Sequence, residues 1–284
     1  MKKSICPTVK TNQMMKKLLT ILCLVLLSSY SYSEDVYQGQ LIIRGDHHYK
    51  KFSLEPFTGN GVDYFKNGKV YYSISFKNGI QDGLLKIFYE TGQLRVKGYG
   101  KNYKKNGYLE RYYENGNIYE KVVYKDDVLD GPFEEFYENG VLNLKTTMKN
   151  GQVHGPVQLF YEDGQLEFRT TFYDGVVEGL LEGYLKNGRL EMSCNYKKGK
   201  PHGLCQLFYE NGQLMFKGTR INNEFDGPIE WFHENGVSKL SGNIKDDELD
   251  GLVTIFNKYG ELTNFGLFED GERIELSVPY IFNP

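Results

Sequence analysis

The sequence lacks the features that mark several large classes of protein. Its formal net charge is only −3 over 284 residues, so it lacks the basic excess with which nucleic-acid binders neutralise phosphates. It has no long hydrophobic run, and its 40% hydrophobic and 25% charged content excludes a disordered tail and a polytopic membrane protein. Its single tryptophan, Trp231, is sparse for a surface that stacks on sugars.

Recognisable catalytic and metal-binding motifs are also missing. The chain contains no Gly-x-Ser-x-Gly elbow, P-loop or dinucleotide fingerprint. Among the five histidines the nearest pair is His47-His48, and adjacent residues on a strand point to opposite faces. No cysteine or carboxylate stands at metal spacing near them. We therefore expect no catalytic residue, no cofactor and no metal site, and a chain that is not an enzyme.

Glycine and aromatic residues are abundant instead, with 32 Gly, 23 Tyr and 18 Phe. This combination is typical of many short strands joined by tight turns. The length alone allows one large domain, two ordinary domains or an array of repeats. An internal repeat decides among these three.

One 24-residue unit recurs nine times without an insertion. Two interleaved glycine series carry the period. The first stands at Gly68, Gly92, Gly116, Gly140, Gly164, Gly188, Gly212, Gly236 and Gly260, and the second at Gly59, Gly83, Gly107, Gly131, Gly155, Gly179, Gly203, Gly227 and Gly251. Two series without a slip predict a repeat array.

Each unit reads as a β-hairpin. An Asp-Gly or Asn-Gly pair between aromatic and aliphatic residues favours a two-residue type I′ turn. With Asp163-Gly164 as that turn, Glu162 faces Gln165, Tyr161 faces Leu166, Leu159 faces Phe168 and Val157 faces Thr170. The neighbouring copy gives Tyr209 with Leu214 and Leu207 with Phe216. The second glycine series predicts a wider connection on the opposite side, as in 149–155.

The predicted fold class is therefore all-β, an extended antiparallel meander or solenoid of nine 24-residue hairpins in a single elongated repeat domain. Two strands per unit at about 4.8 Å give a length on the order of 90 Å. The hairpin repeats span 59–274. We expect an N-terminal cap over 34–58 and a C-terminal cap over 275–284, because the ends of solenoids differ from their middle.

The first 33 residues resemble a secretory signal peptide. Lysines at 16 and 17 precede a ten-residue apolar run over 18–27, and Ser31-Tyr32-Ser33 offers a small-x-small site. The run is too short to span a bilayer, so we expect no stable membrane span in the mature chain. Met14 or Met15 is the expected true start. The mature chain would be exported, to the periplasm, the cell surface or the medium, with 29 basic and 37 acidic residues and a net charge of −8.

The repeat resembles the bacterial variant of the MORN repeat. The resemblance rests on Tyr-Glu-Asn-Gly-x-Leu followed by an aromatic-Lys-Asn/Asp-Gly-x-x-Asp/His-Gly turn, and on the entry Pro56-Phe57-Thr58-Gly59. It covers about residues 56–275. Proteins built wholly from this repeat are commonly classed as YwqK-type antitoxins, so the resemblance implies a repeat protein without a catalytic centre and a toxin as one specific partner.

Two aromatic ladders follow the period. One occupies the fourth position before the turn glycine, from Tyr64 to Phe256, and the other the third position. Two readings stay open for each: packing within the sheet, or an aromatic surface for a peptide or sugar chain. The candidate partner-binding ladder is Tyr89, Tyr113, Tyr137, Tyr161 and Tyr209.

Cys194 and Cys205 flank the turn centred on Gly199, on neighbouring strands and the same face. They are predicted either to form a cross-strand disulfide or to be two small buried hydrophobes. Carboxylates beside the turns have two readings as well, cation binding or hydrogen bonds within their own turns.

Two functions compete. The first is a non-enzymatic, exported scaffold that binds a protein partner, with immunity against a toxin as its specific form. The second is a cell-envelope glycan binder that uses the aromatic ladders. We also expect self-association through the open sheet ends, since an edge strand offers unpaired N–H and C=O groups.

Overall fold

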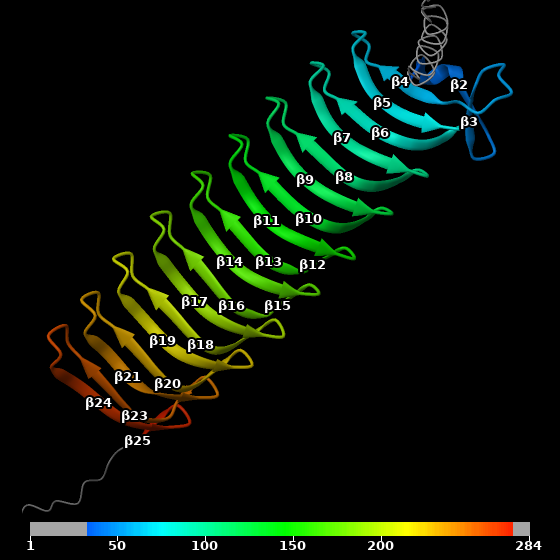
Figure 1. Ribbon diagram of the computed structural model, residues 1–284. Helices are drawn as coiled ribbons and strands as arrows, with labels where there is room; N and C mark the ends of the chain where they lie inside the picture. Colours follow the sequence, from blue (N-terminus) through cyan, green and yellow to red (C-terminus); the bar gives the residue numbers. More distant parts are fainter. Residues whose placement is uncertain (1–32, 275–284) are drawn as a thin grey trace, which may run out of the picture.

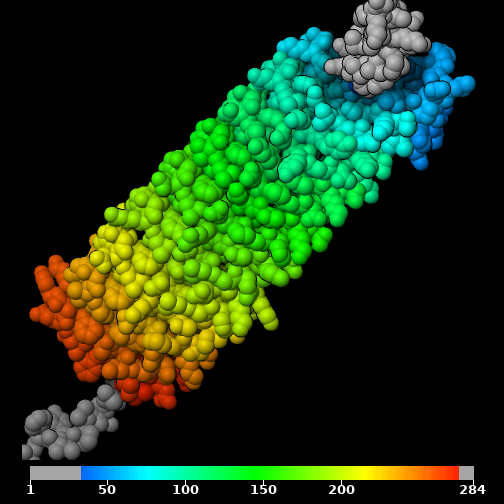
Figure 2. All heavy atoms as spheres, in the orientation of Figure 1, coloured from blue at the N-terminus to red at the C-terminus, as the bar shows by residue number. Residues whose placement is uncertain are grey.

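The chain folds into one long, single-layer, open β-sheet. The structure, a computed structural model, describes residues 33–274. Its strands bow, so the sheet forms a trough whose two long edges are rows of turns (Figure 1). The first and last repeats lie at opposite ends of an elongated body (Figure 2). The leader expected over 1–33, apart from Ser33, and the cap expected over 275–284 fall outside the described residues.

Nine consecutive hairpins make up the array. Their strands are β4 (Gly59–Tyr64) and β5 (Val70–Lys77), β6 (Ile80–Phe88) and β7 (Leu94–Lys101), β8 (Lys104–Tyr112) and β9 (Ile118–Lys125), β10 (Val128–Phe136) and β11 (Leu142–Lys149), β13 (Gly155–Phe160) and β14 (Leu166–Tyr173), β16 (Gly179–Tyr184) and β17 (Leu190–Lys197), β18 (Lys200–Phe208) and β19 (Leu214–Ile221), β20 (Glu224–Phe232) and β21 (Ser238–Lys245), and β23 (Gly251–Phe256) and β24 (Leu262–Glu269). The predicted fold, an open array of hairpins with a 24-residue period, is confirmed.

Shorter elements complete the described chain. The two-residue strands β12 (Gln152–Val153), β15 (Val176–Val177) and β22 (Glu248–Leu249) lead into the strands that follow them. At the N-terminal end lie β1 (Asp35–Tyr37), a 3₁₀ turn η1 (Gln38–Gln40), β2 (Leu41–Arg44) and β3 (His47–Lys50). The sheet ends at β25 (Glu272–Ile274).

The turn at Asp163-Gly164 differs from the prediction. Tyr161 N–H donates to the Gln165 carbonyl and Gly164 N–H to the Tyr161 carbonyl, both at 2.8 Å. In this turn Gly164 has a positive φ of 89°, and Asp163 does not. The loop is therefore a type I turn with a glycine bulge. The bulge pairs Phe160 with Leu166, so the predicted pairs Tyr161–Leu166 and Glu162–Gln165 are wrong.

Beyond the bulge the predicted register holds. Leu159 pairs with Phe168 and Val157 with Thr170. In the next comparable copy Leu207 pairs with Phe216, whereas Leu214 pairs with Phe208 rather than with Tyr209. The error is thus confined to the residues beside the turn.

The tight type I′ turns lie on the opposite side. Asn150 and Gly151 have φ of 51° and 81°, and Lys149 pairs directly with Gln152. Both central residues are left-handed, which defines a type I′ turn. The wider connection predicted there is wrong: the extra residues of 149–155 form a register shift in the following strand instead of a larger loop.

The two faces of the sheet differ in burial. One face carries buried pairs such as Leu109–Val122, Val157–Thr170 and Leu181–Cys194, and we call it the packed face. The opposite, polar face carries cross-strand ion pairs: Lys97–Glu110 at 3.5 Å, Lys145–Glu134 at 3.4 Å and Lys217–Glu230 at 3.0 Å. The alternation is what a sheet with one shielded and one solvated face requires.

The N-terminal end of the sheet is covered by residues 34–58. Strand β1 pairs in parallel with β4, from Asp35 beside Asn60 to Tyr37 beside Val62. Val36, Phe57 and Phe76 form a buried cluster there. Strand β25, whose three residues are exposed, ends the described sheet at the other end. Self-association through such an edge stays a prediction.

Candidate interaction surface

The tyrosines of the candidate ladder join each repeat to the next. Each hydroxyl donates to a backbone carbonyl 23 residues further along the chain. The bonds are Tyr89 to Tyr112 (2.7 Å), Tyr113 to Phe136 (2.9 Å), Tyr137 to Phe160 (2.7 Å), Tyr161 to Tyr184 (2.7 Å) and Tyr209 to Phe232 (2.7 Å). All five rings are half-buried. The polar tips of this ladder are therefore already engaged, and its role in partner binding stays a prediction.

The other ladder lies under the cations of the polar face. Lys121, Arg169 and Lys217 stand 5.6–5.7 Å from the ring centroids of Phe136, Tyr184 and Phe232, respectively. The Tyr112 hydroxyl donates to Glu110 at 2.6 Å, and burial followed by this bond raises the pKa of Tyr112 to about 12. Each of these three cations lies on the hairpin that precedes the ring, so the contacts join successive repeats.

One residue in each hairpin is placed by a β-bulge. In the second copy Ile87 pairs with Val96 and Phe88 with Leu94, which leaves Arg95 as the extra residue. The same shift makes Tyr71 and Tyr119 the extra residues of the first and third copies. A bulge re-aims a side chain that strict alternation would place elsewhere. We call this the bulge position.

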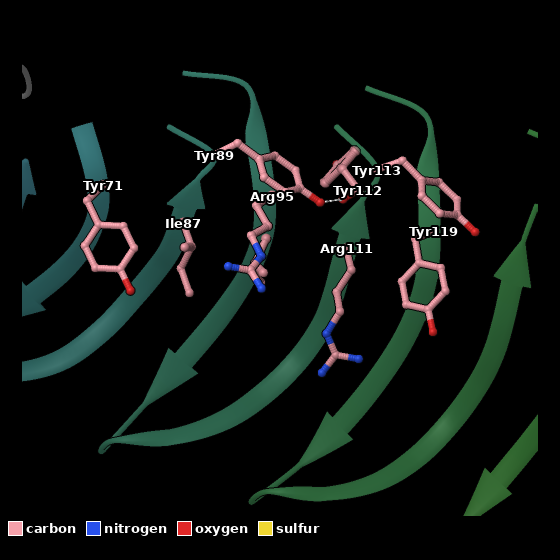
Figure 3. A pocket seen from close by; sticks show the side chains of 9 residues that line it. Tyr71, Ile87, Tyr89, Arg95, Arg111, Tyr112, Tyr113 and Tyr119 are labelled. Atoms are coloured by element: carbon pink, nitrogen blue, oxygen red, sulfur yellow. Dashed lines mark hydrogen bonds between the residues drawn. The ribbon is translucent and has the colours of Figure 1, made fainter. Parts of the chain in front are cut away.

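The bulge residues of the first three copies line a hollow of about 490 Å³. Tyr71, Arg95 and Tyr119 come from β5, β7 and β9, and Ile87 and Arg111 lie between them on β6 and β8 (Figure 3). Tyr89 and Tyr113 stand above them beside the turns (Figure 3). We call this site the Tyr–Arg hollow.

Charged residues occupy both positions of one cross-strand pair beside the hollow. The equivalent pair is apolar in several other copies, as in Ile87 with Val96, Leu159 with Phe168 and Trp231 with Leu240. In the first and fourth copies one member is acidic, Asp63 and Glu135 respectively. In the third copy the same positions hold Arg111 and Glu120, and one guanidinium nitrogen of Arg111 donates to both carboxylate oxygens of Glu120. Glu120 is only 6% exposed, so this ion pair is desolvated on its acidic side.

A second carboxylate faces this ion pair. Glu135 on β10 lies directly opposite Glu120 on β9. Burial, and then repulsion from Glu120, raise the pKa of the Glu135 carboxyl above its ordinary value of 4.5. The third and fourth copies therefore depart from the packing pattern of the array.

Cys194 and Cys205 are direct cross-strand partners on β17 and β18. Their Cα atoms are 4.0 Å apart and a disulfide joins them. Both side chains are buried, at 6% and 8% exposure. The state of these thiols in the cell stays a prediction.

The turn carboxylates act within the fold. Asp163 accepts the Gln165 N–H at 2.9 Å, Glu178 the Lys198 N–H at 2.7 Å and Asp127 the Lys105 N–H at 2.8 Å. Over residues 33–274 no three His, Cys, Asp or Glu side chains gather as metal ligands would. In the same range no helix is long and apolar enough to cross a membrane.

The Tyr–Arg hollow was missed by the sequence analysis, although the signal was present. Aligning the nine copies shows Tyr, Arg, Tyr, Asn, Glu, Glu, Met, Lys and Thr at the bulge position. Strict alternation of strand residues assigns that position to the solvated side, and the sequence analysis drew no inference from its variation. The β-bulge turns the side chain at that position toward the hollow. No residue type in the turn specifies the bulge uniquely, so the sequence pattern did not predict it.

Comparison with protein families finds a match for six of the nine repeats. The MORN repeat variant matches residues 57–78, 81–102, 105–126, 129–150, 153–173 and 201–222. These matches recur with the period of the hairpins. No curated protein matches the chain.

Proposed function

We propose that this chain, six of whose repeats match the MORN repeat variant, is a non-enzymatic scaffold that binds a protein partner on the packed face of its first repeats. One observation carries the proposal: nine copies share a backbone, while the first three place Tyr, Arg and Tyr at the bulge position around one hollow. Tyrosine and arginine are enriched among the residues that dominate binding energy at protein interfaces.

The family and the fold support a binding role. MORN repeats are generally non-enzymatic and often serve binding. A regular array offers a long continuous surface, and specificity then arises from the positions that vary between copies. The Tyr–Arg hollow and the Arg111–Glu120 pair are such positions.

Export and immunity form the finer part of the proposal. The leader pattern over 1–33 supports delivery outside the cytoplasm, and the resemblance to antitoxin arrays supports a secreted toxin as the partner. Mass spectrometry of the mature protein tests export. A chain beginning after Ser33 supports it, and an intact N-terminus contradicts it.

A pull-down tests the binding role. Residues 34–284 serve as bait for the envelope and culture medium of the source organism, and mass spectrometry reads the captured proteins. We expect one stoichiometric protein that binds the purified array again in a binary assay. Retention only on polysaccharide, with no protein enriched, would replace the proposal by the glycan-binding alternative.

The glycan alternative has less support in the geometry. The ladder hydroxyls that would face a sugar already donate to carbonyls of the next repeat. Trp231 packs against Phe216, with ring centroids 4.6 Å apart. Aromatic faces for stacking are therefore largely used within the sheet.

A further inference from the structure

The Tyr–Arg hollow contains a cation without an acidic partner. Arg95 makes no ion pair and no side-chain hydrogen bond within the described residues, and its guanidinium carbon lies 5.6 Å from the ring centroid of Tyr89. The side chain is exposed to the hollow. Its five N–H donors are thus available to a ligand.

The remaining lining residues leave that charge uncompensated. The hollow is lined by two arginines and five tyrosines and by no carboxylate. The other arginine, Arg111, is held by Glu120. Arg95 therefore gives the site one net positive charge, in a chain whose overall formal charge is negative.

Two tyrosines complete the site. Tyr71 packs against Phe65 at 4.9 Å and Tyr119 against Tyr113 at 5.3 Å between ring centroids, so both rings are braced by their own hairpins. Among the described residues neither hydroxyl makes a hydrogen bond, whereas the hydroxyls of Tyr89 and Tyr113 each donate to a backbone carbonyl. The guanidinium fork of Arg95 suits a planar acceptor, and the two tyrosines lie on either side of it along the sheet.

We propose that the Tyr–Arg hollow binds a carboxylate side chain of an acidic segment in the protein partner. Arg95 pairs with the carboxylate, while Tyr71 and Tyr119 flank the chain that carries it. This inference rests on the proposed function and adds the chemistry of the partner. Arginine forms bidentate hydrogen bonds with carboxylates, which supply direction as well as charge.

The test titrates the ¹⁵N-labelled array with hexaglutamate and follows the side-chain Nε–H resonance of Arg95. Hexaglutamine of the same length is the uncharged control. We expect a saturable shift with hexaglutamate and none with hexaglutamine. We also expect Arg95→Gln to weaken hexaglutamate binding by roughly tenfold, the value of one charge-assisted hydrogen bond.

Lys239→Gln is the matched control variant. Lys239 occupies the bulge position of the eighth copy and is exposed, so it carries the same charge at the same place in the repeat, remote from the hollow. The Lys239→Gln substitution should leave the affinity for hexaglutamate unchanged. If Arg95→Gln and Lys239→Gln weaken hexaglutamate binding equally, the binding reflects general electrostatic attraction, which would overturn the proposal.

Two further outcomes separate this inference from the scaffold role. A partner captured equally by wild-type and Arg95→Gln bait would overturn the carboxylate site and leave the scaffold intact. A shift at Arg95 with oligogalacturonate but not with hexaglutamate would assign the hollow to an acidic polysaccharide, which also overturns the proposal.

Discussion

At the scale of single residues, Tyr103 shows how one departure from the repeat serves the fold. It replaces the turn glycine of its copy and holds φ at 61°, a conformation that bulky residues rarely adopt. Its hydroxyl lies 3.0 Å from the Asp46 carbonyl, 3.2 Å from that of Gly79 and 3.0 Å from Nδ1 of the buried His48. The strained residue therefore fastens the β2–β3 hairpin to the array.

Removing that hydroxyl should loosen the N-terminal hairpin. In Tyr103→Phe the ring stays and the contacts with Asp46 and His48 are lost, so we expect faster amide hydrogen exchange over 41–50 and little change elsewhere. Tyr99→Phe, which loses only a bond to Asp82 on the polar face, is the control. Unchanged exchange in Tyr103→Phe would mean that the hairpin is held without it.

Glu135 makes stability depend on pH. The pKa of Glu135 is raised in the folded state. Its favourable contribution to the free energy of unfolding is therefore complete at a pH below its unfolded-state pKa, and it is lost as the pH rises through its folded-state pKa. Glu135→Gln should therefore raise the thermal midpoint at pH 7 and change it little at pH 4. Glu134→Gln, on the opposite face and paired with Lys145 at 3.4 Å, should give no gain. A thermal midpoint of the Glu135→Gln variant below that of the wild type at pH 7 would refute the raised pKa.

At the scale of the hairpin, the sequence predicted the strands and most of their pairing but exchanged the two turns. Hydrophobic alternation was sufficient for Leu159–Phe168 and Val157–Thr170. Both turns contain Asx-Gly, so this dipeptide alone could not distinguish a two-residue turn from a three-residue turn with a bulge. The hydrogen bonds beside each turn distinguish the two turn types, and some of them come from a neighbouring copy. Asn139 of one hairpin, for example, donates to the Glu162 carbonyl in the turn of the next at 3.0 Å.

The tyrosine bonds between hairpins should be measurable. Tyr137→Phe removes the bond to the Phe160 carbonyl and keeps the ring, at an expected cost of about 1 kcal/mol in the free energy of unfolding. Urea denaturation measures it. Tyr108→Phe is the control, because Tyr108 is 68% exposed. Equal midpoints for the two variants would show that the ladder hydroxyls add nothing to stability, and would reopen the ladder as a binding surface.

The cysteine pair offers a second test at this scale. A disulfide between residues 11 apart should stabilise the fold by about 2–3 kcal/mol in the chain-entropy model. The double variant Cys194→Ser/Cys205→Ser, or reduction of the wild type, should lower the unfolding midpoint, and intact-mass measurement after alkylation counts the free thiols. Free thiols at both Cys194 and Cys205 in the unreduced protein would contradict the disulfide.

At the scale of the whole molecule, the period predicted an elongated array because each 24-residue unit pairs with its neighbours in sequence. The parallel pairing of β1 with β4 was not predictable in the same way, since it joins residues 25 apart without a repeat signal. The Tyr–Arg hollow combines side chains from three successive copies. It becomes visible only once the bulges have placed Tyr71, Arg95 and Tyr119 together.

The measurement that tests the central claim most directly is hydrogen–deuterium exchange of the array with and without its captured partner. If the first copies form the binding surface, protection will concentrate in β5 to β9, residues 70–125, around Arg95. Protection centred on the fifth to ninth copies, or spread evenly along the sheet, would contradict a site built from the bulge residues of the first three repeats.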